Sequence, residues 1–444
     1  MKNIYKLLTS LSVFMLLLVI TSCNSDNEVE PLFDQSINER TDALKSEYSN
    51  ILTAPENGWV GYYSPNESFG FYTVLFDFDE NGSVALKSDY DSGSADNSVT
   101  YRIDKSLKIE LVFESSSVFS QIFSLNNNDN GGEFVFNILS ATDNEVVLES
   151  KLDYGSDITV FTLRRARADE LDLAPVYASV NNISGDGTES VFRNILFNDE
   201  AIGSFSFNPT TRYATVTYLT DGEFEIVSVP IIITATGFSF VDPLDINGVI
   251  LTSFEYNDTE NQFENPADAL KIVYDDIPGL PLTPYDFGNE AGNIRILRTN
   301  DGFLSVDRSS SNFINLFEGW RSDFEASIGL PITRFYIRDI GSDVAYLDIW
   351  IPVTGGTARA YFDCTVDVTQ DASGNNIVKF TFIEDSPGNQ DFGLASFFAP
   401  MTDFIFRESG FYVQKMELLN AAGQNTLGLI PVDDPSMLVH WYDF

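Results

Sequence analysis

The residue types that carry out nucleophilic and metal chemistry are scarce in this sequence of 444 residues, which has one histidine and two cysteines. Zinc sites built on two or three imidazoles are therefore excluded, and no His-Glu-x-x-His motif occurs. A Ser-His-Asp triad would have to use His440, and the sequence has neither a Gly-x-Ser-x-Gly motif nor a glycine-rich phosphate loop. We interpret His440 as a structural residue of the last strand, and we predict no catalytic residue.

Carboxylates, in contrast, are abundant. The 66 acidic residues supply many pairs of the kind that glycoside hydrolysis requires, and the sequence alone selects none of them. Residues 77–82 follow the first half of an EF-hand calcium loop, with carboxylates at positions one and three. The twelfth position, where a bidentate glutamate completes such a site, is Ser88, and the flanking patterns are those of strands. We interpret this segment as a hairpin turn and predict no metal site and no cofactor.

Aromatic side chains are candidates for ligand binding, because an exposed ring provides a flat apolar platform for a sugar. Trp59, Tyr62, Tyr63, Trp350 and Trp441 are available, although aromatic residues make up 14% of the chain and most must belong to the core. Tyr62 and Tyr63 are adjacent on a predicted strand, so one of them faces outward or into a barrel lumen. We therefore predict Trp59, Tyr62 and Tyr63 as ligand-binding residues, with a carbohydrate or a peptide as the ligand.

The cysteine near the N-terminus has a sequence context that predicts lipidation. Lys2 and Lys6 precede an apolar stretch over residues 7–20, which is too short to span a bilayer and is typical of a signal peptide. Small residues at 21 and 22 lead to Cys23, a pattern that resembles a lipobox of Bacteroidota-type lipoproteins. We predict a signal peptide over residues 1–22 and acylation of Cys23, since several acyl chains make a firm anchor. Cys364 is the other cysteine, and its strand-like surroundings place it in a core.

The polar segment over residues 23–35 and the overall charge bear on location and partners. This acidic tether resembles the export signal of lipoproteins on the outer leaflet, which predicts an outer-membrane location with the chain exposed at the cell surface. The net charge of −41 becomes still more negative once the signal peptide is removed. Such a surface repels phosphate backbones, so nucleic acid is excluded as a partner, and the membrane contact is expected to run through the lipid anchor.

The elements that must position these residues begin with a helix. Ser36 and Glu39 form a capping box, and Leu44 and Tyr48 follow at helical spacing before Pro55 ends the helix. Short β-branched and aromatic segments separated by Asp, Asn, Gly and Ser clusters then predict a series of strands. The predicted strands cover residues 58–63, 69–78, 83–89, 98–103, 107–113, 133–139, 145–150 and 157–163. Sequential short strands with tight turns favour an antiparallel meander that forms a barrel or a sandwich, and we prefer a lipocalin-like barrel.

The whole chain is therefore predicted to be mainly β, with further β-rich regions after this first domain. The domain over residues 36–165 is followed by a predicted linker over 166–188, a second β-rich region over 189–278, and a third over 286–444. The third region is predicted to contain one helix over residues 312–328, because aromatic residues recur there at helical spacing and Gly329 follows. The second and third regions could also form one domain.

Short motifs in rather more than the first half of the chain form a recognisable set. They include Ala54-Pro55, Asn57-Gly58-Trp59, Tyr62-Tyr63, Phe76-Asp77, Asn81-Gly82, Thr100-Tyr101-Arg102-Ile103, Gly132-Glu133-Phe134, Thr236-Gly237-Phe238 and Ile246-Asn247-Gly248. Together these motifs resemble a Bacteroidota lipoprotein family, domain of unknown function 4302. The sequence departs from that pattern after Phe113, where an aromatic-rich run is missing. These are fold motifs without a chemical signature, so the resemblance implies no catalytic residue.

The resemblance also implies a context. Members of the family resemble accessories of outer-membrane nutrient-uptake loci, which predicts a TonB-dependent transporter or a SusD-like lipoprotein as a partner. Our leading hypothesis is a non-enzymatic surface lipoprotein that binds a ligand or a partner during nutrient uptake. The alternatives are a glycan hydrolase that uses paired carboxylates and a structural subunit of an envelope complex.

Overall fold

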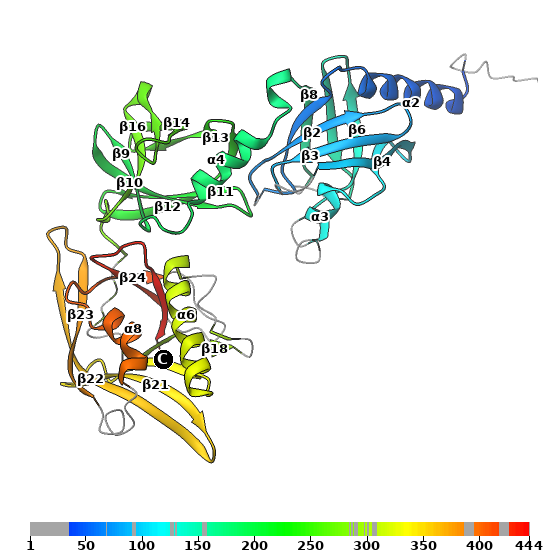
Figure 1. The fold of residues 1–444 in the computed structure, drawn as a ribbon. Helices are drawn as coiled ribbons and strands as arrows, with labels where there is room; N and C mark the ends of the chain where they lie inside the picture. Colours follow the sequence, from blue (N-terminus) through cyan, green and yellow to red (C-terminus); the bar gives the residue numbers. More distant parts are fainter. Residues whose placement is uncertain are drawn as a thin grey trace, which may run out of the picture. The chain divides into compact units, whose positions relative to one another are not determined.

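The chain is mainly β, as predicted, and its strands form closed barrels rather than sandwiches. The computed structural model describes residues 35–443, with gaps at residues 68, 91–94, 125–127, 129–130, 153–157, 284, 286, 288–291, 297, 300–301, 304–308, 386–394 and 417–425. Within these residues the strands form three closed, eight-stranded antiparallel barrels (Figure 1). The described residues up to Asn50 form one compact unit, and the chain from Ile51 onward, with all three barrels, forms another.

Barrel 1 is a meander in which each strand pairs with the next and the last strand pairs with the first. It comprises β1 (Trp59–Tyr63), β2 (Tyr72–Phe78), β3 (Ser83–Ser88), β4 (Ala95–Lys105), β5 (Ile109–Phe113), β6 (Val135–Ala141), β7 (Glu145–Ser150) and β8 (Val160–Arg165). Pairing of β1 with β8 closes the barrel, with Val60 opposite Arg164. These strands match the eight segments predicted from the sequence. The turn between β2 and β3 contains the calcium-like motif, and the side chains of Asp79 and Asn81 accept backbone N–H bonds within it.

The predicted first helix is α2 (Ile37–Thr53), and its capping box is confirmed. The backbone N–H of Ser36 donates to Glu39 Oε2 over 2.8 Å, and the N–H of Glu39 donates to Ser36 Oγ over 3.2 Å. These bonds satisfy donors that the start of a helix leaves without partners, and the bond from the Ser36 N–H to the carboxylate lowers the pKa of Glu39. At the other end, the indole of Trp59 donates to the carbonyl of Leu52 over 2.8 Å, which ties the end of the helix to β1.

Aromatic side chains fill the interior of barrel 1. The short helix α3 (Val118–Ser124) inserts Phe119 among the strands, and its ring centroid lies 4.8 Å from that of Phe113 and 5.2 Å from that of Tyr63. Phe136 and Phe161 complete this cluster, and every one of these five rings is buried. The interior is therefore a packed core in which edge-to-face ring pairs contribute beyond the burial of apolar area.

Barrel 2 repeats the meander and carries one helix. It comprises β9 (Phe192–Phe197), β10 (Glu200–Asn208), β11 (Tyr213–Thr220), β12 (Glu223–Thr234), β13 (Gly237–Ile246), β14 (Val249–Asn257), β15 (Gln262–Asn265) and β16 (Leu270–Asp275), and β16 pairs back to β9. Helix α4 (Ala174–Ser184) precedes it and packs against β10, β12 and β13. Its Val176 and Ile183 join a buried cluster with Phe205 and Ile231 of the barrel.

Barrel 3 closes in the same way around two helices. It comprises β17 (Ile294–Ile296), β20 (Arg334–Arg338), β21 (Ala345–Val353), β22 (Gly356–Gln370), β23 (Asn376–Asp385), β24 (Phe411–Met416), β25 (Thr426–Pro431) and β26 (Val439–Asp443), and β26 pairs with β17. In the sequence, the paired strands β18 (Arg298–Thr299) and β19 (Gly302–Phe303) lie between β17 and a helix that begins at Ser311. The helices α6 (Ser311–Ile328) and α8 (Ala395–Ile405) contact each other (Figure 1). They contribute Phe317, Trp320 and Phe398 to the core of barrel 3.

Two details of this organisation differ from the predicted domains. Residues 166–188, predicted as a linker, contain the 3-10 helix η3 (Ala168–Glu170) and helix α4, which packs against barrel 2. The third region contains α8 in addition to the predicted helix α6. The second and third β-rich regions form separate barrels. Barrel 2 ends with the short 3-10 helix η4 (Pro266–Asp268) and strand β16, and the chain then continues to barrel 3. Cys364 is fully buried in barrel 3, and burial raises the pKa of its thiol to about 12.

The predicted signal peptide, Cys23 and nearly all of the acidic tether lie outside the described residues. Among the helices that the structure does describe, none combines the length and the apolar character needed to cross a bilayer.

Candidate functional site

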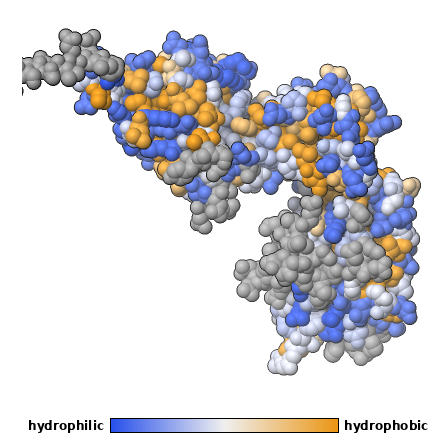
Figure 2. Space-filling view, turned by 180° about the vertical axis from the view of Figure 1, so that it is seen from behind, coloured by the Kyte–Doolittle hydropathy of each residue, from blue (hydrophilic) through white to orange (hydrophobic). Residues whose placement is uncertain are grey.

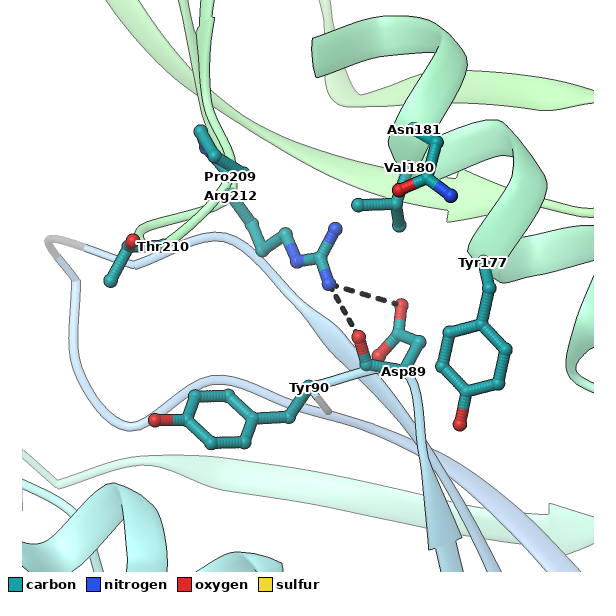
Figure 3. A pocket seen from close by; sticks show the side chains of 8 residues that line it. All are labelled: Asp89, Tyr90, Tyr177, Val180, Asn181, Pro209, Thr210 and Arg212. Atoms are coloured by element: carbon teal, nitrogen blue, oxygen red, sulfur yellow. Dashed lines mark hydrogen bonds and ion pairs between the residues drawn. The ribbon is translucent and has the colours of Figure 1, made fainter. Parts of the chain in front are cut away.

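A cavity of about 510 Å³ lies where barrels 1 and 2 meet. Its volume is within the range of roughly 300–1,000 Å³ that is typical of small-molecule sites. The chain that follows β3, helix α4 and the turn between β10 and β11 provide its walls (Figure 3). The lining residues are Asp89, Tyr90, Tyr177, Val180, Asn181, Pro209, Thr210 and Arg212.

The turn between β10 and β11 forms because Asn208 caps it. The side-chain oxygen of Asn208 accepts the N–H groups of Thr210 and Thr211, over 2.9 and 3.1 Å, and its carbonyl accepts the N–H of Arg212. Asn and Pro favour such turns because Asn can bond its own backbone and Pro fixes φ. Arg212 adopts a φ of 55° at the end of the turn, which directs its side chain into the cavity (Figure 3).

Backbone hydrogen bonds hold this turn against barrel 1. The N–H of Gly70 donates to the carbonyl of Thr211 over 2.6 Å, and the N–H of Phe71 donates to the carbonyl of Ile231 over 3.3 Å. Tyr72 donates its hydroxyl to the carbonyl of Thr210. On the other side of the cavity, the hydroxyl of Tyr177 in α4 donates to the carbonyl of Ser88 over 2.6 Å. The cavity walls are therefore fixed by bonds to backbone atoms.

Arg212 is the most unusual residue of the site, because its long charged side chain is only 2% exposed. Its Nη2 donates to the carbonyl of Asp89 over 2.6 Å and lies 4.0 Å from Asp89 Oδ2. The guanidinium carbon also lies 5.4 Å from the ring centroid of Tyr72, which is a cation–π distance. Within the described part of the chain, Nε and Nη1 have no hydrogen-bond partner. A buried guanidinium with unused donors is costly, and native proteins rarely leave such groups unsatisfied.

Asp89 faces Arg212 and is buried to the same degree. Its Oδ1 accepts the N–H of Thr73 over 2.8 Å, whereas its Oδ2 has no hydrogen-bond partner among the described residues. Burial raises the pKa of the Asp89 carboxyl to about 6, although the charge of Arg212 and the bond from Thr73 act in the opposite direction. The site therefore holds a charged donor and a charged acceptor side by side, each with hydrogen-bonding capacity left over.

The raised pKa of Asp89 predicts a specific pH dependence of stability. The folded chain keeps the Asp89 proton up to about pH 6, whereas the unfolded chain loses it near the ordinary value of 3.8. Ionisation of Asp89 therefore destabilises the fold as pH rises through this window, by about 3 kcal/mol, and the penalty is absent below the window. We expect protection against hydrogen exchange at residues 69–73 and 209–213 of the wild type, relative to that of Asp89→Asn at the same pH, to fall between pH 4 and pH 6.5. A difference that stays constant with pH would contradict the assignment.

Two of the three predicted ligand-binding residues lie in the core of barrel 1. Trp59 and Tyr63 are fully buried, and the hydroxyl of Tyr63 accepts the N–H of Glu133 over 3.0 Å. In this conformation neither ring offers a surface to a ligand, because the interior that was considered as a lumen is filled. Tyr62 is half-buried and interacts with Arg164 of the neighbouring strand β8. The structure thus brings Trp59 and Tyr63 together as packing residues of the same barrel, outside the set that lines the cavity.

The other residues considered from the sequence are also packed. Trp441 and His440 are fully buried in β26, and the two rings of His440 and Tyr442 pack edge to face. Trp350 is partly exposed, but the guanidinium of Arg334 covers its ring at 4.2 Å from the centroid. Across the described residues, no three His, Cys, Asp or Glu side chains gather closely enough to hold a metal ion.

Asp89 and Arg212 were not found by sequence reasoning. Both lie at the ends of strands near turn residues, where a charged side chain is usually solvated. The signal that could have drawn attention to them is weak, because it consists of a tyrosine after Asp89 and a turn before Arg212. Only the contact between the two barrels, more than a hundred residues apart in the sequence, brings them together.

Apolar side chains also lie on the described surface of the molecule. Figure 2 shows apolar residues gathered in parts of one face of the molecule, with hydrophilic residues around and between them. Exposed large apolar side chains occur at Leu107, Val160 and Ile277, among others. Scattered apolar side chains of this kind are normal on folded proteins, so we assign no site to them.

Comparisons with known proteins address the family. Among curated proteins, none matches this chain significantly. One matching solved structure is an endo-1,5-alpha-L-arabinanase from Thermotoga petrophila RKU-1. The match covers 91% of this chain and 88% of that chain, with 7% sequence identity and a TM-score of 0.12. A likeness this weak supports no inference. The family model described as a domain of unknown function, DUF4302, matches residues 29–258, which is more than half of the chain. This match includes barrel 1 and every residue that lines the cavity. The chain therefore belongs to the DUF4302 family.

Proposed function

We propose that the mature chain is a lipid-anchored protein of the cell envelope that binds a small polar ligand in the cavity between barrels 1 and 2. The observation that carries this proposal is the buried Arg212, which lines a cavity of about 510 Å³ and has two nitrogens without hydrogen-bond partners in the described structure. A ligand that accepts hydrogen bonds from these nitrogens would offset the cost of burying them. In this proposal the protein serves as an accessory of nutrient uptake at the outer membrane.

The composition of the cavity supports binding over hydrolysis. Glycoside hydrolysis uses two carboxyl groups roughly 5–9.5 Å apart, one on each side of the scissile bond. Among the described residues that line the cavity, Asp89 is the one carboxylate. A single acid beside an arginine can orient a ligand, but it does not supply both the acid and the base or nucleophile that such a reaction needs.

Mass spectrometry of the native protein tests the proposal directly. We expect the wild type, extracted in mild detergent from its own membranes, to carry a bound small molecule that is released on denaturation. Arg212→Gln is expected to lose this molecule, whereas Arg102→Gln, which makes the same change on the exposed surface of barrel 1, is expected to keep it. Equal ligand occupancy in the two variants would place the binding site elsewhere and contradict the proposal.

The anchor is a separate prediction. Replacing Cys23 with alanine removes the thiol that the acyl chains modify, so Cys23→Ala is expected to release the protein from the membrane fraction. Fractionation of cells that express each form, followed by immunoblotting, measures the effect. A variant that remains with the membranes to the same extent as the wild type would show that lipidation at this cysteine is not the anchor.

The uptake context is tested by the proteins that copurify. Recovery of a TonB-dependent transporter or a SusD-like lipoprotein with the tagged wild type would support an accessory role at the outer membrane. A stoichiometric envelope complex without any bound small molecule would instead favour a structural subunit.

A further inference from the structure

The unused hydrogen-bonding sites in the cavity carry opposite charges. Among the described residues, Arg212 Nε and Nη1 find no hydrogen-bond acceptor, and Asp89 Oδ2 finds no hydrogen-bond donor. Both side chains are almost completely buried, so bulk water does not offset the free-energy cost of removing their charges from solvent. Hydrogen bonds to charged partners are shorter and roughly twice as strong as neutral ones, and they are the contacts that such groups favour most.

The two charged groups are also adjacent. Arg212 Nη2 and Asp89 Oδ2 are 4.0 Å apart, and another guanidinium nitrogen points away from Asp89 toward Val180 and Asn181 of α4 (Figure 3). A ligand that satisfies both groups at once must therefore carry its own opposite charges close together. The ammonium and carboxylate groups of an α-amino acid meet this requirement, since both are attached to one carbon atom.

We propose that the ligand of this cavity is a free α-amino acid, whose carboxylate binds Arg212 and whose ammonium binds Asp89. This inference rests on the proposed function and names its ligand class. Tyr90, Tyr177 and Val180 also line the cavity, and in this proposal they would face the side chain of the bound amino acid.

Charge balance favours this class over other small ligands. A ligand with only a carboxylate would place an uncompensated negative charge beside Asp89, and one with only an ammonium would place a positive charge beside Arg212. A neutral sugar would keep the balance but would offer hydroxyl groups to two buried charges, which makes weaker hydrogen bonds. An α-amino acid keeps the site neutral and gives each buried charge a charged partner.

Isothermal titration calorimetry of the full mature chain tests this proposal with three probes: L-leucine, L-phenylalanine and L-glutamine. We expect saturable one-to-one binding of at least one of them. Its N-acetyl derivative lacks the ammonium and its amide derivative lacks the carboxylate, so each is expected to bind about 10–100 times more weakly, the range for loss of a charged hydrogen bond.

Substitution of Asp89 supplies the matched test. Asp89→Asn keeps the acceptor for the Thr73 N–H but removes the charge, so it is expected to weaken binding of the amino acid by about 10–100-fold. The N-acetyl derivative is expected to bind this variant at least as tightly as the wild type, because its carboxylate no longer meets the Asp89 charge. Asp242→Asn makes the same change at an exposed position of β13 and is expected to bind like the wild type. Hydrogen exchange of the variants confirms that the barrels remain folded.

The outcomes separate the two proposals. Absence of binding by all three amino acids, or equal binding of the amino acid and both derivatives, overturns the amino acid assignment. If maltose binds the wild type and Arg212→Gln abolishes that binding, the ligand is a neutral polyol: the amino acid assignment fails and the proposed function stands. If an amino acid binds with equal affinity to the wild type, Asp89→Asn and Arg212→Gln, its site lies outside this cavity and the amino acid assignment fails. The proposed function fails with it only if Arg212→Gln also retains the small molecule detected by native mass spectrometry.

Discussion

Phe119→Ala is expected to destabilise barrel 1 by about 3–5 kcal/mol, the usual cost of removing a buried phenylalanine ring. Phe119 is fully buried, and α3 holds it in the centre of the barrel. Its ring contacts those of Tyr63, Phe76, Phe113, Phe136 and Phe161. Truncation would leave a cavity between strands from opposite sides of the closed barrel, and a closed sheet can collapse only partly to fill it.

Hydrogen exchange measured by mass spectrometry resolves this effect barrel by barrel, which is necessary because a chain of several barrels does not unfold in two states. We expect reduced protection in peptides from β1 to β8 and unchanged protection in β20 to β26. Leu107→Ala is the control, since Leu107 is 100% exposed in the same barrel and its truncation is expected to change stability by less than about 0.5 kcal/mol. An equal loss in barrels 1 and 3, or no loss in barrel 1, would contradict the structure of this core.

The strands and their meander order could be predicted from the sequence because their signals are local. Residues that alternate between apolar and polar indicate a half-buried strand, and clusters such as 79–82 indicate a tight turn. When strand follows strand across tight turns, neighbours in sequence are neighbours in the sheet. The capping box of Ser36 and Glu39 and the aromatic stripe that ends at Gly329 identified α2 and α6 for the same reason.

The helices that were missed lack such local signals. Helix α3 has seven residues, which is too short for a helical period to stand out, and its sequence also suits a strand. Helix α8 contains Pro400, which argues against a helix interior when only the sequence is considered. Helix α4 begins after polar and charged residues that indicated a linker, and contacts with β12 and β13 stabilise it. In each case tertiary packing outweighs the local preference.

The candidate site was beyond prediction for a related reason. Trp59 and Tyr63 were selected because aromatic rings bind sugars, but the closure of barrel 1 places both inside its core. Asp89 and Arg212 belong to no motif with a chemical signature, and their chemistry arises only from burial and from their mutual contact. A charged residue near a turn has the same appearance in a sequence whether it faces water or a second barrel.

Gly70 is the residue that allows barrel 1 to approach the turn between β10 and β11, so Gly70→Ala is expected to open their junction. A Cβ atom at this position would lie 2.0 Å from the carbonyl oxygen of Arg212 and 2.8 Å from its carbonyl carbon. Because both are backbone atoms, a change of rotamer cannot relieve the overlap. Overpacking costs about 1–3 kcal/mol, and loss of the bond from Gly70 N–H to Thr211 adds about 1 kcal/mol.

The expected result of Gly70→Ala is a junction weakened by about 2–4 kcal/mol, with ligand occupancy reduced and the cores of both barrels intact. Hydrogen exchange is expected to rise at residues 69–73 and 209–213, and native mass spectrometry reports the ligand. Gly319→Ala is the control, since a Cβ there meets no atom within 4 Å and alanine stabilises a helix interior by about 0.5–1 kcal/mol. If Gly70→Ala retained full occupancy together with wild-type protection at the junction, the close contact would not be required for the cavity. If it lost protection at the junction but kept the ligand, the cavity would not be the binding site, because Arg212 and Asp89 reach each other only across this contact.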